Sequence, residues 1–144
     1  MEIKKLDAAQ REGALALALR VFLACDAPDY ADAGIASFRA FLSDEAAIGG
    51  LEFFGAKEGE KLLGVLATGE QRSHLCLFFV NPRFQRQGIG RALWEYLLQN
   101  SDNRRFTVNS SPAAVDFYHA LGFADLDTEQ LRGGIRYTPM QFER

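Results

Sequence analysis

The sequence from residue 81 to residue 93 reads NPRFQRQGIGRAL. It follows an apolar run that ends at Val80 and precedes a segment whose apolar residues recur at helical spacing from Ile89 onward. A glycine-rich turn in this position exposes the first N–H groups of the helix, which have no partners within the helix and lie at the positive end of its dipole. Gly88 and Gly90 allow a ligand to approach the backbone, and the neighbouring arginines add positive charge. The stretch therefore predicts a site for an anion such as phosphate.

An ordinary strand–helix turn with solvated arginines is the alternative interpretation, because Gly-x-Gly spacings are common. A dinucleotide-binding fold is disfavoured, because its motif has glycine where Leu93 stands, and a Walker A loop is excluded, because no Gly-Lys-Ser/Thr follows. The charge distribution favours a small anion. The formal net charge of the chain is −3, whereas residues 81–105 carry five arginines against Glu95 and Asp102. A long polyanion such as nucleic acid is therefore not expected as a partner.

The composition is that of an ordinary globular protein. The 144 residues are 48% hydrophobic and 24% charged, which predicts one domain over residues 1–144. Cys25 and Cys76 are isolated in apolar contexts, so they predict buried thiols in a reducing compartment rather than a disulfide or a metal site. No signal-peptide core and no apolar run near the ~20 residues of a membrane span is present, so we expect a cytoplasmic protein without a membrane partner.

The pattern of apolar residues predicts an α+β domain with elements in the order β-α-α-β-β-β-α-β-α-β-β. Tight turns join the middle strands, so the sheet is expected to be mainly antiparallel with at least one parallel crossover. The continuous apolar run Leu75–Val80 predicts a strand that is covered on both faces. The expected strands are at 2–6, 51–57, 61–68, 74–80 and 105–109, and the chain is expected to close with a hairpin of 124–131 and 135–142 around Gly133-Gly134. The first helix is capped by Asp7 and Gln10 and should bury Leu15, Ala18, Leu19 and Phe22; an acidic loop at 26–32 separates it from a second helix with Ile35, Phe38, Phe41 and Leu42 on one face. Two later helices begin at residue 89 and at Pro112, and Gly122 ends the second of these.

Two motifs make the prediction more specific. Gln85-Arg-Gln-Gly-Ile-Gly90 matches the Q/R-x-x-G-x-G/A signature of the GCN5-related N-acetyltransferases, at the expected place between a strand and a helix. Residues 108–123, VNSSPAAVDFYHALGF, resemble a later motif of that family, a strand leading to a helix that ends Phe-Tyr-x-x-x-Gly-Phe. The final strand, Tyr137–Phe142, and the order of elements also agree. The chain thus resembles a small, bacterial-type, single-domain member of this family over nearly its whole length.

The resemblance implies that acetyl-coenzyme A binds where two neighbouring parallel strands separate, here His74–Val80 and Arg105–Asn109. Backbone groups of the first strand would hold the pantetheine arm and polarise the thioester carbonyl, and the glycine-rich turn would hold the pyrophosphate. Many relatives carry Asn where this chain has Ser111, which is shorter and is expected to cap the next helix, leaving Asn109 to make the contact. The implied binding residues are Phe78, Phe79, Val80, Gln85, Arg86, Gln87, Gly88, Ile89, Gly90, Arg91, Asn109 and Ser111.

The resemblance also implies catalytic roles. Tyr118 occupies the position of the general acid, and a phenol with a pKa of ~10 can protonate a leaving thiolate. The general base stays open between His74, which begins the central strand and titrates near neutrality, Glu70, and a chain of waters. Covalent catalysis by Cys76 is disfavoured, because a buried apolar thiol is a poor nucleophile.

The expected function is transfer of an acetyl group from acetyl-coenzyme A to a primary amine of a small molecule or a protein, by direct attack in a ternary complex. The alternative is a non-catalytic domain of the same fold that binds acyl-coenzyme A, which the presence of Tyr118 disfavours. The acceptor is not specified. Asp26, Asp29 and Asp32 either attract a cationic amine or form a solvated acidic loop. A homodimer is compatible with the family.

Overall fold

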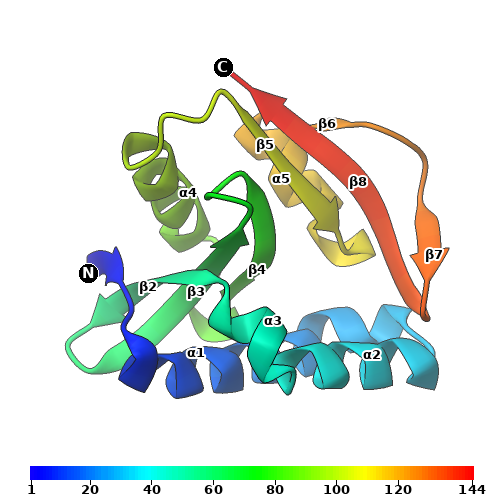
Figure 1. Cartoon of the computed structure of the whole chain (residues 1–144), viewed down its shortest axis with the longest axis horizontal. Coiled ribbons are helices and arrows are strands. Elements are labelled where there is room, and N and C mark those ends of the chain that lie inside the picture. Colours follow the sequence, from blue (N-terminus) through cyan, green and yellow to red (C-terminus); the bar gives the residue numbers. More distant parts are fainter.

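The computed structural model describes all residues from Met1 to Arg144 and has the predicted α+β fold (Figure 1). No helix combines the length and the apolar composition that a membrane crossing requires. The strands are β1 (Glu2–Lys5), β2 (Glu52–Glu58), β3 (Lys61–Gly69), β4 (His74–Val80), β5 (Arg105–Ser110), β6 (Ala124–Asp125), β7 (Gln130–Arg132) and β8 (Ile135–Glu143). The helices are α1 (Ala8–Val21), α2 (Asp32–Leu42), α3 (Glu45–Gly49), α4 (Ile89–Gln99) and α5 (Val115–Leu121), with a π-helical turn at Phe22–Asp26 and 3-10 turns at Ala27–Asp29, Pro82–Phe84 and Pro112–Ala114.

The sheet separates into two parts at its single parallel pair. The strand order is β1-β2-β3-β4-β5-β8-β6, with β7 also paired to β8, and every pair except β4–β5 is antiparallel. β4 and β5 share only two register positions, His74 with Thr107 and Leu75 with Val108. Beyond these positions the strands diverge, which is visible as the angle between β4 and the β5–β8 pair (Figure 1). The predicted separation of two parallel strands is thus present.

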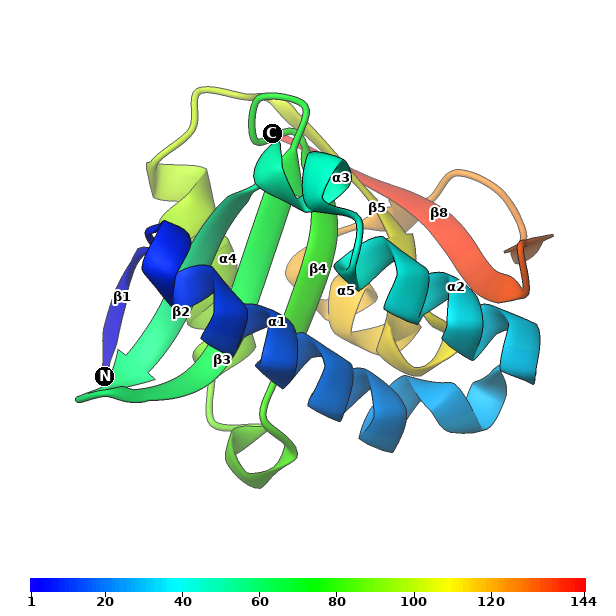
Figure 2. The same cartoon turned by 60° about the horizontal axis from the view of Figure 1, so that its bottom comes forward.

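Helices cover both faces of β4, as its continuous apolar run predicts. α1, α2 and α3 lie on one face, and α4 and α5 lie on the other (Figure 2). Leu75 packs in the core under α4, whereas Leu77 packs in the core under α1. Two residues of one strand with this spacing normally share a face, but the β3–β4 register shifts here, so that Leu75 pairs with Thr68 and Leu77 with Ala67. The bulge leaves Cys76 unpaired and reverses the alternation of side chains.

Several local predictions are confirmed. The side chain of Asp7 accepts the Gln10 N–H at 2.9 Å and the Gln10 side chain accepts the Asp7 N–H at 2.9 Å, which is the predicted capping box. Gly59, at φ 60°, makes the turn of the β2–β3 hairpin, and Gly122, at φ 104°, ends α5 in the left-handed region.

The buried face of α1 was predicted incorrectly in part. Ala14, Leu17 and Val21 are buried, whereas the predicted core residues Leu15 and Leu19 are only half-buried. The stretch GALALALRV carries apolar residues around most of the helix, so periodicity alone does not select one face. Contacts of α1 with β3 and β4 make that selection.

Three further expectations are corrected. The acidic segment 26–32 is a solvated loop only in part: Asp29 and Asp32 are exposed, but Asp26 ends the π-helical turn and is buried, and residues 27–29 form a 3-10 turn. A short helix, α3, was not predicted, although Asp44 caps it by accepting the Ala47 N–H at 3.1 Å. The expected strand 124–131 is split into β6 and β7, which pair with different parts of β8.

Candidate active site

One pocket of about 1080 Å³ occupies the space that opens between β4 and β5. It extends from the glycine-rich turn before α4 to the region between α2 and the β7–β8 hairpin. Gln87 and Glu70 do not line it. The predicted site residues that do line it are His74, Phe78, Phe79, Val80, Gln85, Arg86, Gly88, Ile89, Gly90, Arg91, Asn109, Ser111 and Tyr118.

The edge of β4 that faces the pocket offers backbone groups of Phe78 and Val80. The Asn81 N–H donates to Leu63 O on β3 at 2.8 Å, and backbone groups of a strand point to alternate edges. Those of Phe79 therefore face β3, and those of Phe78 and Val80 face the opening. The expectation that backbone groups of Phe78, Phe79 and Val80 all face the ligand is wrong for Phe79, which contributes its ring to the pocket, and the Val80 carbonyl already accepts a bond from the Gln85 side chain.

The turn before α4 presents a series of backbone donors. The first bond of the helix runs from the Ala92 N–H to Gly88 O at 2.9 Å, so the N–H groups before Ala92 have no partner in the helix. Arg86 has a left-handed backbone at φ 63° and Gly88 at φ 82°, which turns successive N–H groups toward the concave side. The geometry is that of an anion-binding helix N-terminus.

The two glycines of the turn are required for different reasons. Gly88 has open space around a hypothetical Cβ, so its left-handed φ is what favours glycine. Gly90 has no positive φ, but a Cβ there would lie 2.9 Å from Cζ of Phe117. Packing against Phe117 of α5 is thus sufficient to disfavour a side chain at Gly90.

The polar side chains of the turn differ in their freedom. The Gln85 side chain donates to Val80 O at 3.0 Å, which ties the turn to the end of β4. Arg91 donates to Ala120 O at 3.3 Å and so reaches the end of α5. Arg86 makes no hydrogen bond or ion pair in the protein, so its guanidinium is available to an anion at the mouth of the pocket.

Tyr118 projects from α5 into an aromatic cluster beside β4. Its ring lies 6.1 Å from that of Phe78 and 5.4 Å from those of Phe117 and Phe123. The residue is 5% exposed, and its hydroxyl has no hydrogen-bond partner in the protein although Tyr118 lines the pocket. Burial, together with the nearby charge of Asp26, raises the pKa of this phenol well above its usual value. Tyr118 therefore holds its proton at neutral pH.

Ser111 does not cap the helix that follows it. No bond joins its side chain to the Pro112–Ala114 turn, and its hydroxyl instead donates to Oδ1 of Asp26 at 3.3 Å. The expectation of a capping role is therefore wrong: the hydroxyl is directed at the buried carboxylate of Asp26, and its oxygen accepts no backbone N–H of the following turn. Asn109, two residues earlier on β5, lines the pocket and its side chain makes no bond in the protein.

The structure separates the three groups considered for base or nucleophile. His74 lines the pocket where β4 and β5 are still paired; its Nδ1 lies 2.7 Å from Thr107 Oγ1, and burial lowers its pKa. Cys25 and Cys76 are free thiols, but both are half-buried rather than buried as predicted, because both line the pocket; partial burial raises the pKa of the Cys76 thiol, which makes it a poor nucleophile. Glu70 is exposed in the turn before β4.

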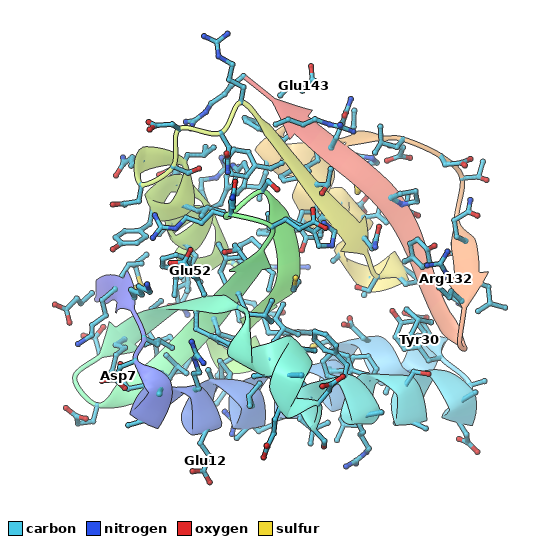
Figure 3. All side chains as sticks on the ribbon, in the orientation of Figure 1. Asp7, Glu12, Tyr30, Glu52, Arg132 and Glu143 are labelled. Carbon is cyan, nitrogen blue, oxygen red and sulfur yellow. The ribbon has the colours of Figure 1, made fainter.

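The far end of the pocket is closed by a contact between α2 and the β7–β8 hairpin. The Ser37 hydroxyl donates to Gly133 O at 2.6 Å, and the Tyr30 hydroxyl donates to Arg136 O at 3.1 Å. Tyr30 and Arg132 face one another across this region (Figure 3). Segments about a hundred residues apart thus form the wall opposite the glycine-rich turn.

Sequence reasoning missed most of this far wall. Phe22 stacks on Phe38 with ring centroids 3.9 Å apart, and Phe38 packs edge-on against Phe79 at 5.8 Å. All three rings line the pocket. Their spacing in the sequence indicates only core faces, so no local signal separates a lining residue from a core residue. The sequence did single out Asp26, as one of three aspartates that could attract a cationic amine, but it did not predict that this carboxylate is buried.

Comparisons with known proteins agree with this geometry. Peptidyl-lysine N-acetyltransferase YiaC of Escherichia coli (strain K12) is 38% identical over 72 residues, which is 49% of this chain and 49% of that protein. The UPF0157 protein YqkA of Bacillus subtilis (strain 168) is 28% identical over 89 residues, 58% of this chain and 26% of that protein. The matches thus span about half or less of the curated relatives.

Solved structures share the fold over nearly the whole chain. A GCN5-related N-acetyltransferase from Rhodopseudomonas palustris superposes with a TM-score of 0.84 at 16% identity, covering 99% of this chain and 95% of that one. PaiA N-acetyltransferase from Thermoplasma acidophilum, in complex with coenzyme A, gives a TM-score of 0.78 at 20% identity, and the superposition covers 99% of this chain and 98% of that one. The family model for the acetyltransferase (GNAT) domain matches residues 26–144. The chain belongs to the GNAT acetyltransferase family.

Proposed function

We propose that this chain is an N-acetyltransferase that takes an acetyl group from acetyl-coenzyme A and transfers it to a primary amine. One observation carries the proposal: a single pocket joins the unpaired N–H groups of the glycine-rich turn to the Tyr118 hydroxyl along the separated edge of β4. The groups that would hold the anion, pair with the pantetheine arm and donate the proton thus line one pocket.

The residues present fit acetyl-coenzyme A, which supplies the reactive thioester when bound. The turn from Gln85 to Arg91 would hold the pyrophosphate through backbone N–H groups, with the Arg86 guanidinium beside it. The backbone groups of Phe78 and the N–H of Val80 would pair with the amides of the pantetheine arm, as a neighbouring strand would, while Val80 O stays bonded to the Gln85 side chain. Ile89 and the Asn109 side chain complete the lining on either side, while Gln87 would contribute its backbone only.

The chain's own residues would supply two parts of the chemistry. A backbone N–H of Phe78 or Val80, on the edge of β4 that faces the pocket, would donate to the thioester oxygen as negative charge develops there. The Tyr118 hydroxyl would give its proton to the departing sulfur. Its raised pKa keeps it in the acid form throughout the neutral range, and the aromatic cluster around it excludes water.

The experiment has two stages. Acetyl-coenzyme A should raise the melting temperature of the protein, because a ligand that binds only the native state stabilises it. Thiol release is then measured with a panel of amines that includes a peptide with one lysine, since one relative is a peptidyl-lysine N-acetyltransferase. No thermal shift at a large excess of acetyl-coenzyme A would contradict the proposal.

A thermal shift without thiol release for any amine would instead support the non-catalytic alternative, a domain that binds acyl-coenzyme A.

Two predictions from the sequence accompany the proposal. We propose that residues 1–144 form one catalytic domain and that the protein acts in the cytoplasm, either alone or as a homodimer. Gel filtration combined with light scattering measures the oligomeric state.

A further inference from the structure

Asp26 is a charged residue buried in the wall of the pocket. It is 8% exposed, and the other buried polar residues, Thr68, Ser110 and Thr138, are all neutral. It ends a π-helical turn, a rare conformation that is frequent at functional sites. A buried carboxylate is expensive unless it is paired, so a position of this kind points to a function.

The surroundings of Asp26 contain no cation that neutralises it. None of the ion pairs in the structure includes Asp26. Its only side-chain bond is the one it accepts from Ser111, at the end of β5. Asp29 and Tyr30 of the same segment and Tyr118 of α5 are the charged or titratable groups that interact with it. The other titratable side chains of the pocket wall, which make no bond to it, are Cys25, His74, Cys76, Arg86, Arg91, Asp116, Arg132 and Tyr137.

Burial raises the pKa of Asp26 to about 6, with a smaller contribution from Asp29, and the Ser111 bond opposes the rise. The carboxyl is therefore ionised at neutral pH but has the basicity that proton transfer near neutrality requires. Asp26 and Tyr118 both line the pocket, and the charge of Asp26 contributes to the raised pKa of Tyr118.

We propose that Asp26 is the general base of the reaction: its carboxylate binds the ammonium group of the acceptor and removes one proton from it. The inference rests on the proposed function. One N–H bond of the ammonium breaks and one O–H bond forms on Asp26. The freed nitrogen lone pair then forms the N–C bond to the acetyl carbon while the C–S bond breaks. The sulfur receives the proton of Tyr118, the nitrogen returns its second proton to the Tyr118 oxygen, and Asp26 releases its proton to solvent.

The two bases expected from the sequence fit this role less well. His74 lies where β4 and β5 are still paired, and its lowered pKa leaves it neutral at neutral pH, so it offers no charge to an ammonium group. Glu70 is exposed and outside the pocket. Asp116 of α5 also lines the pocket, but it is exposed, so Asp26 is the one buried carboxylate of the pocket wall, and its charge acts on Tyr118.

The site also indicates the kind of acceptor. The rings of Phe22, Phe38 and Phe79 line the same region of the pocket, and Asp26 is the one acidic group on the α1–α2 wall. This environment suits a single primary amine on an apolar stem. A second positive charge close to the first would be buried among aromatic rings without a partner. A lysine side chain and a small alkylamine or arylalkylamine share this chemistry.

Asp26→Asn is the decisive variant, because asparagine keeps the shape and can still accept the Ser111 bond. Thiol release is measured against pH with n-butylamine, phenethylamine, spermidine and a peptide with one lysine. In the wild type, kcat/KM should fall as the pH drops below about 6. In Asp26→Asn, kcat should fall by about 10²–10⁴-fold and this acid limb should disappear, while the thermal shift with acetyl-coenzyme A is unchanged.

Asp29→Asn is the matched control. Asp29 is exposed and does not line the pocket, so this variant should keep its turnover and move the acid limb slightly to lower pH, because Asp29 raises the pKa of Asp26. Asp26→Ala, assayed with added formate, is a second test; a supplied carboxylate should restore part of the rate. The rate with the one-lysine peptide, compared with the rates with n-butylamine and phenethylamine, shows whether the acceptor is a lysine side chain or a small amine.

The outcomes separate the inference from the proposed function. Turnover of Asp26→Asn within about threefold of wild type, or an acid limb that persists in this variant, overturns the role of Asp26 and leaves the acetyltransferase function standing. Absence of thiol release by the wild type with every amine overturns both. Loss of activity together with loss of acetyl-coenzyme A binding in Asp26→Asn also contradicts a role as base, because the residue would then be structural.

Discussion

The backbones of Gly34, in the first turn of α2, and Gly134, at the tip of the β7–β8 hairpin, lie so close together that a Cβ on either would overlap the other. Figures 1 and 2 show the hairpin meeting α2 at this point. The contact completes the wall around the far end of the pocket. Small residues at both positions are therefore a condition of the closed pocket.

Gly34→Ala should separate the hairpin from α2, because the added methyl group would overlap the Gly134 carbonyl, which is backbone and cannot rotate away. We expect a loss of about 1–3 kcal/mol of stability and a higher KM for the amine, with acetyl-coenzyme A affinity unchanged. Chemical denaturation and steady-state kinetics measure these effects. Gly13→Ala is the control, since its Cβ would meet nothing within 4 Å, and it should stabilise α1 by about 0.5–1 kcal/mol. Equal effects of the two variants would contradict the role of the contact.

Gly90→Ala should weaken acetyl-coenzyme A binding indirectly. The new methyl group would displace the ring of Phe117, which packs edge-on against Phe78 with centroids 5.3 Å apart. We expect the Kd to rise by about tenfold, equivalent to about 1.4 kcal/mol. Isothermal titration measures it, and Phe117→Leu in the same chain should restore part of the affinity by removing the overlap. If the double variant binds no better than Gly90→Ala, close approach of the ligand to Gly90 is the better explanation.

Tyr118→Phe should lower kcat by about 10²-fold or more while leaving acetyl-coenzyme A affinity nearly unchanged, because the hydroxyl would act only on the departing sulfur. Stability should change little, since the hydroxyl has no partner in the protein to lose. Tyr96→Phe is a matched control on α4, where the ring packs against Phe54 outside the pocket. Unchanged turnover in Tyr118→Phe would remove this residue from the mechanism.

Asp26→Asn should be more stable than the wild type near neutral pH. A carboxyl whose pKa is raised from 3.8 to about 6 favours folding below its unfolded pKa, and that contribution is lost as the pH rises through its folded pKa. Asparagine does not ionise, so its burial costs the same at every pH. We therefore expect the free energy of unfolding of Asp26→Asn to exceed that of the wild type by about 1–3 kcal/mol at about pH 8 and to differ little from it at about pH 4. Denaturation at both pH values tests this. A stability gain combined with lost turnover would separate a functional carboxylate from a structural one.

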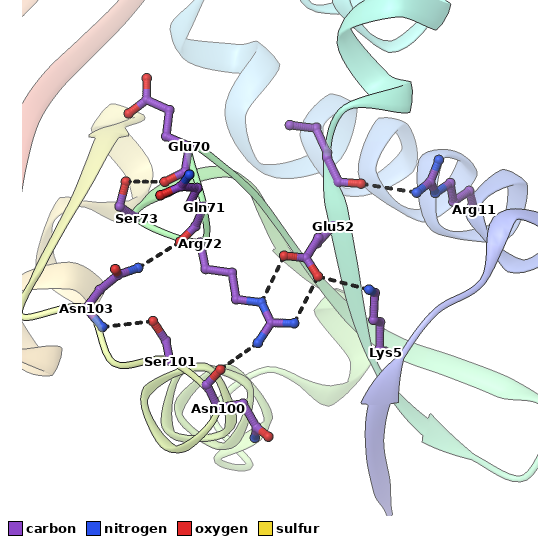
Figure 4. A network of polar contacts seen from close by, with 11 residues as sticks. Lys5, Arg11, Glu52, Glu70, Gln71, Arg72, Ser73, Asn100, Ser101 and Asn103 are labelled. Carbon is purple, nitrogen blue, oxygen red and sulfur yellow. Dashed lines mark hydrogen bonds and ion pairs between the residues drawn. The ribbon is translucent and has the colours of Figure 1, made fainter.

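A network around Arg72 should determine stability in acid. Arg72 donates from Nε and Nη2 to the two carboxylate oxygens of Glu52, each at 2.9 Å, and Lys5 lies 3.0 Å from Glu52 (Figure 4). These bonds hold the Glu70–Arg72 turn, whose three residues all have positive φ, a conformation that costs non-glycine residues about 1–2 kcal/mol each. The turn leads directly into β4 at the point where β4 and β5 still pair.

The bond from Arg72 lowers the pKa of Glu52 to about 2, against an ordinary 4.5. A depressed carboxyl pKa stabilises the fold above its unfolded value and loses that effect as the pH falls toward its folded value. Stability should therefore drop between about pH 4.5 and pH 2, and Glu52→Gln should lose about 1–2 kcal/mol near neutrality together with this part of the pH dependence. Glu60→Gln, on the exposed β2–β3 turn, is the control. An unaltered acid transition in Glu52→Gln would contradict the assignment.

Local signals were sufficient for much of the fold. β4 begins and ends where its apolar run predicts, and the Asp7–Gln10 capping box and the Gly122 helix end form as expected. Each of these features depends on residues within a few positions of one another, so periodicity and capping chemistry describe them adequately. The turn before α4 belongs to the same class, because its free N–H groups follow from its place at the start of a helix.

The sequence by itself thus determined the family, the glycine-rich turn with its free N–H groups and the position of Tyr118 on the helix that follows β5. Only the tertiary structure decided what lies opposite Tyr118. The Asp26–Ser111 bond joins residues 85 positions apart, and the Tyr30–Arg136 bond joins residues 106 apart. Burial of a single aspartate, the packing reason for Gly90 and the closure of the far wall all depend on which distant segments meet. Chain closure over such separations is settled by the packing of the whole core rather than by any local preference, so no local pattern records it.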